Sequence, residues 1–150
     1  MTEKVVLGPG EGEAHTNHLG ARILIRMSGR ETGGAYAVVE AEQPVDSPAA
    51  PLHVHDREDE AIQVLEGQLI VEVDGHKYDA PAGSLVFIPR GTAQRFWNPG
   101  PGNARYQSVF TPAGQEDYFR RAYSLDVTDQ DFPAKLAGLR QEFGLRYPPT

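Results

Sequence analysis

The chain has 150 residues, no cysteine and a formal net charge of -7 at pH 7. This length suits a single domain with a sizeable core, and the lack of cysteine excludes disulfides, thiolate metal ligands and cysteine nucleophiles. The acidic balance disfavours nonspecific binding to nucleic acid or to an anionic membrane, so we expect a small-molecule ligand. The first residues contain no basic region followed by an apolar run, and no stretch is apolar enough to span a membrane, which predicts a cytoplasmic protein.

Short segments rich in branched and aromatic residues run through the middle of the chain and predict strands. These segments are 21–27, 35–41, 61–65, 68–73, 84–88, 94–97 and 104–110. The turn Asp74-Gly75 is the clearest hairpin signal, because a type I′ turn needs positive φ at both central residues. The spacing of strands and turns favours an antiparallel sandwich or barrel. The proline-rich run 44–51 predicts a surface segment.

The last forty residues predict helices instead, over 114–125 and 132–144. Pro133 suits the first turn of the second helix and Gly144 can end it. Leu136, Leu139 and Phe143 would form one apolar face. We expect both helices to pack against their own domain, with a specialised lid or a dimer contact as the alternatives.

His53, His55 and Glu60 form the pattern His-x-His-x4-Glu. Side chains two residues apart share one face of a strand, so the histidine pair favours a strand. The odd separation would put Glu60 on the other face of an unbroken strand, so we expect the polar run 56–59 to turn and bring Glu60 in from a neighbouring strand. Two imidazoles and a carboxylate can surround one cation. With nitrogen and oxygen donors alone, such a site suits iron, manganese, nickel, copper or zinc.

The same residues also have ordinary explanations. The two histidines and Glu60 could form only a hydrogen-bonded or solvated cluster, and without a metal Glu60 could act as an acid or base. Glu58 and Asp59 are rival carboxylates, but we expect the run 56–60 otherwise to be a solvated turn. Three further histidines are expected at the surface: His15, His18 and His76.

A second segment completes the pattern. Gly83-x5-Pro89-x-Gly91-x2-Gln94-x3-Asn98 resembles the second cupin motif, and His53-x-His55-x4-Glu60-x6-Gly67 resembles the first. The chain therefore resembles a single-domain cupin, and its runs 110–123 and 135–149 are similar to the small quercetin-dioxygenase-like cupins. The resemblance implies an all-β fold, a cupin (double-stranded β-helix or jelly-roll) barrel with short C-terminal helices. The barrel core would cover about 20–112 and the helical segment about 114–146 of one domain, 1–150. It also implies a homodimer.

The cupin resemblance implies one divalent transition metal per chain, bound by His53, His55 and Glu60, with Gln94 at a fourth position where most such proteins have histidine. A glutamine amide oxygen is a weaker donor to late transition metals than an imidazole. Three outcomes stay open: Gln94 binds the metal weakly, it hydrogen-bonds a metal-bound water or substrate, or the site is poor in metal. Two histidines and one carboxylate also match the composition of the facial triad of non-haem iron oxygenases.

Alternation along the strands predicts which side chains face the interior. Ile62 and Val64 share the parity of Glu60, and Phe96 shares that of Gln94. Tyr36 and Tyr106 are candidate polar contacts. These five residues would line a fairly apolar pocket for a small organic ligand, unless they simply fill the core.

The leading functional hypothesis is a metal-dependent, dioxygenase-like oxidoreductase that acts on a small aromatic or enolic substrate. Glu60 would bind the metal and also accept a substrate proton, as the catalytic residue. The first alternative is an oxygen-independent cupin cyclase or isomerase, in which the metal polarises a carbonyl and His53, Glu60 or a metal-bound water moves a proton. The second alternative is a cupin that binds a small molecule without catalysis. The sequence has no attached helix-turn-helix segment, which argues against a transcription factor.

Overall fold

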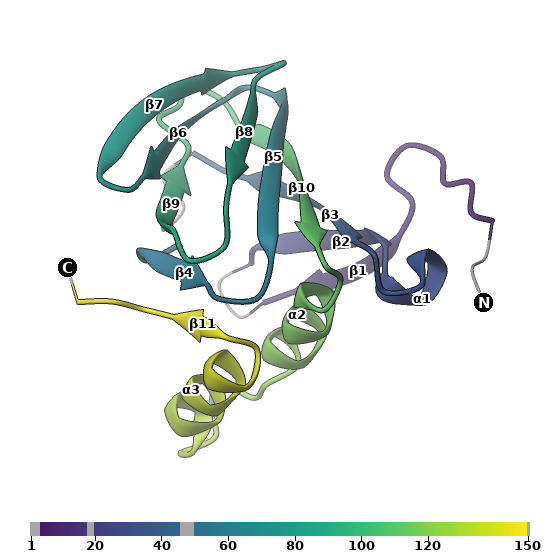
Figure 1. The fold of residues 1–150 in the computed structure, drawn as a ribbon, viewed down its shortest axis with the longest axis vertical. Coiled ribbons are helices and arrows are strands. Elements are labelled where there is room, and N and C mark those ends of the chain that lie inside the picture. Colours follow the sequence, from purple (N-terminus) through teal and green to yellow (C-terminus); the bar gives the residue numbers. More distant parts are fainter. Residues whose placement is uncertain (1–3, 18–19, 46–49, 150) are drawn as a thin grey trace.

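The computed structural model describes residues 4–17, 20–45 and 50–149, so His18 and residues 46–49 of the predicted surface segment lie outside the described residues. Within these ranges the chain folds into two antiparallel sheets that face each other, with helices at one end (Figure 1). The fold is therefore mostly β with few short helices, as predicted. Among the described residues, no helix is long and apolar enough to cross a membrane.

The larger sheet has six strands and the smaller has five. The larger contains, in spatial order, β1 (Glu13–Thr16), β2 (Arg22–Met27), β3 (Ala37–Gln43), β10 (Ala104–Thr111), β5 (Asp59–Glu66) and β8 (Leu85–Ile88). The smaller contains β11 (Leu145–Arg146), β4 (His53–His55), β9 (Ala93–Trp97), β6 (Gln68–Val73) and β7 (His76–Pro81). A single helical turn, α1 (Gly29–Thr32), connects β2 to β3.

Alternating side chains build the core between the two sheets. Ile62 and Val64 enter from β5, while Leu69 and Val71 enter from β6, and each is at most 1% exposed. Their polar neighbours along the strands point the other way, which is the period-two pattern expected of a half-buried strand. The predicted hairpin is confirmed, because Val73 pairs with His76 around a two-residue turn whose residues have φ of 50° and 80°.

The seven predicted strand segments correspond to β2, β3, β5, β6, β8, β9 and β10, with shifts of a few residues at their ends. Strands β1, β7 and β11 were missing from the prediction. The sequence of β7, HKYDAP, has five exposed side chains of six and so lacks the apolar alternation that marks a strand. Its pairing with β6 makes it a strand.

Both predicted helices are present, as α2 (Gln115–Tyr123) and α3 (Phe132–Glu142). Proline stands in the first turn of α3, and Gly144 follows its end with a φ of 70°. Leu139 packs with Tyr118 of α2 and Leu145 of β11 in a small apolar cluster. In Figure 1, α2 and α3 lie below the barrel. The helices thus cover their own chain through β11, as the sequence led us to expect.

Candidate metal centre

The predicted ligands come from both sheets. His53 and His55 lie on β4 of the smaller sheet, where the two-residue spacing gives them one face, and their ring centroids are 5.1 Å apart. Glu60 lies near the start of β5, which belongs to the larger sheet. The chain turns at residues 56–58 and crosses from one sheet to the other. The carboxylate therefore approaches from the facing sheet and not from a strand that pairs with β4.

Gln94 and Ser108 hold the carboxylate of Glu60. Gln94 is paired with His53 in the register of β4 and β9, and its Nε2 donates to Glu60 Oε1 at 3.0 Å. Ser108 Oγ donates to the other oxygen, Oε2, at 2.7 Å. All three side chains are at most 3% exposed. Both oxygens of the buried carboxylate thus accept hydrogen bonds, which fixes its orientation.

Hydrogen bonds also fix the two imidazoles. Nδ1 of His53 lies 2.8 Å from the carbonyl oxygen of Pro51, and Nδ1 of His55 lies 2.8 Å from Glu58 Oε1. A carbonyl oxygen only accepts, so Nδ1 of His53 carries the hydrogen. A metal-binding histidine usually donates its second ring nitrogen to such a carbonyl or carboxylate, which leaves Nε2 for the metal. Burial, and then the nearby His55, lower the pKa of His53 and favour its neutral, metal-binding form.

The donor set fits a divalent cation in three respects. First, His55 Nε2 lies 3.5 Å from Glu60 Oε1. Two neighbouring ligands that each stand about 2.0–2.2 Å from a first-row metal are about 3–3.5 Å apart. Second, Gln94 Oε1 is a buried acceptor without a hydrogen-bond partner among the described residues. Third, Glu58 and Glu60 are both buried carboxylates, and a dication would balance their charge.

The donors nevertheless do not meet at one point. Within the described part of the chain, no group of three histidine, aspartate or glutamate side chains has the spacing of a closed metal site. Oε1 of Glu60 is directed at the amide nitrogen of Gln94. A cation at this position would take the place of that hydrogen bond.

Glu58 contradicts the prediction that the run 56–60 is a solvated turn. Its side chain is 4% exposed and bonds to His55, whereas Asp59 bonds to Arg90 in an exposed pair. The sequence offered both residues only as rivals of Glu60. Their opposite environments follow from the position of β5, which begins at Asp59. Successive side chains of a strand point to opposite faces, so Asp59 points outward whereas Glu58 and Glu60, on either side of it, point inward.

The C-terminal segment forms a further wall of the site. Leu145 of β11 pairs with His55 of β4, so the residue after β11, Tyr147, lies beside His53. The two rings are stacked, with centroids 5.9 Å apart and planes inclined by 29°. The guanidinium carbon of Arg140, which lies on α3, stands 4.0 Å from the centroid of the Tyr147 ring and so extends the stack. Burial raises the pKa of Tyr147 to about 12.

Ser108, Glu58 and Tyr147 are site residues that the sequence did not reveal. A serine between inward-facing Tyr106 and Phe110 on β10 was an available signal, because alternation gives all three one face. Nothing in the sequence pointed to Tyr147, because its place depends on the two-residue strand β11.

Four of the five predicted pocket residues face the interior, but they fill it. Ile62, Val64 and Phe96 belong to the main core cluster and Tyr106 packs against it, with Phe96 and Tyr106 centroids 5.0 Å apart. Burial raises the pKa of Tyr106. The cavities of about 580 and 460 Å³ in the described residues are lined by other side chains. These four residues thus match the alternative that they form the core.

Tyr36 does not fit the prediction. It is 39% exposed, and its backbone nitrogen and oxygen both bond to the hydroxyl of Thr32. Tyr36 lies just before β3, outside the strand that faces the interior. His15 and His76 lie outside the site, since His15 pairs with Glu13 at 2.5 Å and His76 is exposed.

Comparison with known proteins agrees with the fold and with the ligand motif. Residues 39–118 match the family model described as the cupin domain. The chain belongs to the cupin family.

The chain is similar in sequence to one characterised cupin and in fold to several solved cupin structures. Quercetin 2,3-dioxygenase of Bacillus subtilis is 35% identical over 92 residues, which are 61% of this chain but only 26% of that protein. KdgF from Halomonas sp. superposes with a TM-score of 0.64 at 17% identity, over 77% of this chain and 99% of that one. The polyketide cyclase RemF from Streptomyces resistomycificus gives 0.57 at 22%, over 74% and 80%. At these identities, both structures show the shared fold.

Proposed function

We propose that this cupin binds one divalent transition metal through His53, His55 and Glu60, and acts as a dioxygenase-like oxidoreductase on a small organic substrate. The observation that carries the proposal is the orientation of the donors. Each imidazole has its Nδ1 tied by a hydrogen bond, and Nε2 of His55 faces the Glu60 carboxylate at 3.5 Å. The similarity to quercetin 2,3-dioxygenase supports the choice of reaction class, although this chain spans about a quarter of that protein.

Gln94 would stand at the fourth position. Its buried Oε1 has no hydrogen-bond partner and could serve as a neutral oxygen donor. Rotation of the amide would break the bond from Nε2 to Glu60 and turn Oε1 toward the metal instead. A metal held by this set would supply Lewis acidity or redox chemistry to a bound substrate. A substrate or water could displace this weak fourth donor from the metal more easily than it could displace an imidazole.

Glu60 has a second role in the proposal, as the acceptor of a substrate proton. Ser108 bonds Oε2 of Glu60, so it would keep the carboxylate oriented while Oε1, which faces the histidines, exchanged its bond to the metal for the substrate proton. A general base must lie within hydrogen-bond reach of the proton that it accepts. We therefore expect the substrate hydroxyl or enol to bind between Glu60 and the histidines.

Aromatic rings around the histidines support a planar, unsaturated substrate. Phe110 lies 5.6 Å from His55, measured between ring centroids, and Tyr147 stacks on His53. Rings of this kind favour offset stacking with another π system. A phenol or an enol is the class of substrate that these walls would accept.

Metal analysis tests the ligands. The protein, purified without a histidine tag, should contain close to one transition-metal ion per chain, and His53→Ala and Glu60→Ala should lose it. His76→Ala is the matched control, because His76 is exposed on β7 and should leave the metal content unchanged. Retention of metal in both site variants would refute the ligand assignment.

Oxygen consumption tests the reaction. Across a panel of phenols and enols that includes a flavonol, the metal-loaded protein should consume oxygen, and Glu60→Gln should not. Turnover that continues under anaerobic conditions would favour a cyclase or an isomerase. Specific binding of a panel compound without any product would favour a binding protein.

A further inference from the structure

A second cavity lies behind the C-terminal wall of the metal centre. It has a volume of about 460 Å³ and is bounded by α3, by β11 and by the turn that follows β4. Figure 1 shows α3 and β11 side by side near the C-terminal end of the chain. Arg140, Leu145 and Tyr147 are part of its lining, whereas none of the predicted metal ligands is. The cavity, called here the C-terminal cavity, is therefore distinct from the metal centre.

Arg140 is the unusual side chain of the C-terminal cavity. It is half-buried, and its Nε is covered and has no hydrogen-bond partner among the described residues. The two carboxylates nearby are already paired, Asp56 with Arg146 at 2.7 Å and Glu142 with Arg121 at 2.7 Å. The guanidinium packs on the ring of Tyr147 instead. A guanidinium stays charged in proteins, and a charge withdrawn from water is costly unless an anion pairs with it.

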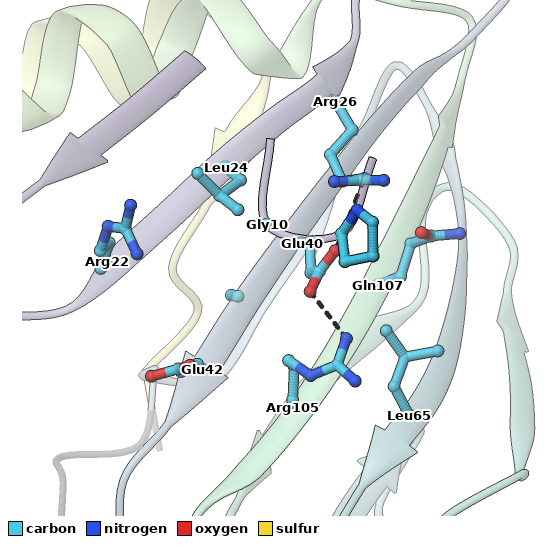
Figure 2. Close-up of a pocket in the computed structure, with 11 residues that line it drawn as sticks. Gly10, Arg22, Leu24, Arg26, Glu40, Glu42, Leu65, Arg105 and Gln107 are labelled. Atoms are coloured by element: carbon cyan, nitrogen blue, oxygen red, sulfur yellow. Dashed lines mark hydrogen bonds and ion pairs between the residues drawn. The ribbon is translucent and has the colours of Figure 1, made fainter. Parts of the chain in front are cut away.

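The larger cavity, of about 580 Å³, shows how arginines elsewhere in the chain are satisfied (Figure 2). Arg105 donates to one oxygen of Glu40 at 2.8 Å, and Arg26 lies 3.5 Å from the other. Arg22 lines the same cavity, but it is exposed and so keeps its hydration. The cations of the larger cavity are thus neutralised or hydrated, whereas Arg140 is partly withdrawn from water without an anion.

The charges of the C-terminal cavity favour a ligand with a single negative charge. Asp56 neutralises Arg146, which leaves one net positive charge, that of Arg140. A phosphate dianion would exceed this charge and would be repelled by Asp56. A guanidinium presents parallel N–H donors in one plane, and this fork matches the two oxygens of a carboxylate. A carboxylate is therefore the anion that fits Arg140.

The size and the other walls of the C-terminal cavity indicate that the carboxylate belongs to an organic molecule. A volume of about 460 Å³ is in the range of cavities that hold small organic ligands. Leu145 and Ala137 supply apolar surface, and the Tyr147 ring supplies an aromatic wall. Such walls favour an apolar group next to the charge.

We propose that the C-terminal cavity binds a small organic monocarboxylate, which pairs with Arg140 and packs its apolar part against Leu145 and Ala137. Tyr147 belongs to both sites, because its ring stacks on His53 and also carries the guanidinium of Arg140. The bound acid would neutralise this cation and stabilise the C-terminal wall from outside the metal centre. The proposal requires neither a bound metal nor the proposed reaction.

Calorimetric titration with benzoate tests the charge. Benzoate carries one carboxylate on a flat apolar ring, and benzamide has nearly the same shape without the charge. Benzoate should bind the wild-type protein with a dissociation constant of about 1 mM or lower, and benzamide at least about tenfold more weakly. Arg140→Gln should weaken benzoate binding at least about tenfold, and Arg140→Lys, which keeps the charge but not the fork, should weaken it less. Equal binding of benzoate and benzamide, or no binding of benzoate at about 10 mM, would overturn the proposal.

Two controls separate the C-terminal cavity from other places that could hold benzoate. Arg22→Gln removes the exposed arginine of the larger cavity, and dialysis against a chelator removes any metal. Each should change the dissociation constant for benzoate less than about twofold. Loss of binding in Arg22→Gln would assign benzoate to the larger cavity. Loss of binding after dialysis would place the carboxylate on the metal, and either result would refute the proposal.

Hydrogen–deuterium exchange locates the ligand without a substitution, which matters because Arg140→Gln also removes the contact with Tyr147. At about ten times the dissociation constant, benzoate should slow exchange in residues 137–147 by up to about elevenfold, because opening of the cavity would require release of the ligand. Residues 22–27 of β2, in the larger cavity, are the matched control and should exchange at an unchanged rate. Slower exchange in 22–27 with no change in 137–147 would refute the assignment.

Discussion

Replacement of Glu58 by glutamine should weaken metal binding although Glu58 is not itself a predicted ligand. Its Oε1 lies 2.8 Å from Nδ1 of His55, and its side chain is 4% exposed. A carboxylate in this position fixes the ring and increases the basicity of Nε2. Loss of such a partner costs about 10–100-fold in metal affinity, which corresponds to about 1.4–2.7 kcal/mol. Glutamine keeps the shape and an acceptor oxygen, so we expect a value near the lower limit.

Competition with a fluorescent chelator measures this effect, with Zn²⁺ as the probe because it has no redox chemistry. Asp59→Asn is the matched control at the adjacent position, where the carboxylate bonds to Arg90 at the surface. It should change the dissociation constant for Zn²⁺ less than twofold. If Glu58→Gln and Asp59→Asn bind Zn²⁺ equally well, Glu58 has no role in positioning His55. Equal binding by His55→Ala would refute the site itself.

Three further predictions concern the fourth position, the C-terminal wall and a surface ion pair. Gln94→His should tighten Zn²⁺ binding about tenfold in the same competition, because an imidazole is the stronger donor; unchanged affinity in both Gln94→His and Gln94→Ala would exclude Gln94 from the site. Tyr147→Ala should lower the free energy of unfolding by about 2 kcal/mol in urea titrations, while Tyr147→Phe keeps the stack on His53 and should lose less than half of that; equal losses would assign the effect to the hydroxyl. The hydrogen bond from Arg120 lowers the pKa of Glu13 to about 2 from 4.5, so the stability it contributes is complete above pH 4.5 and is lost as the pH falls through 2. Since Glu13 is solvent-exposed, Glu13→Gln should cost less than about 1 kcal/mol at pH 7, and the difference from wild type should shrink as the pH falls toward 2 and disappear below it. A difference that does not shrink would have another cause.

The parts of the fold that the sequence predicts are those in which local pattern and burial agree. β5 and β6 are rich in branched apolar residues and bury alternate side chains, and Asp74-Gly75 can adopt the positive φ values of a tight turn. Each of these signals is local to a few residues. β7 and β11 could not be predicted, because neighbouring strands and not their own composition make them strands.

The candidate site divides in the same way. The histidine pair and Glu60 follow from a spacing in the chain, but the residues that orient them come from distant segments. Ser108 bonds to Glu60 across 48 positions of sequence, and Tyr147 reaches His53 from the last residues of the chain. The prediction of a solvated turn was wrong for Glu58, because local polarity does not reveal that the chain crosses between two sheets at that point.

The C-terminal wall lies beyond the part of the chain that the family model matches. The family match ends at residue 118, yet β11 pairs with the strand that carries both histidines, and Tyr147 covers His53. Asp56, next to His55, also bonds to Arg146 at 2.7 Å, so the ligand strand and the C-terminal segment are fixed to each other. A cupin with the same histidines but another C-terminal segment would present a different surface to its substrate. Residues 140–147 are therefore the positions at which substitutions should change the substrate that is accepted while the three predicted ligands stay the same.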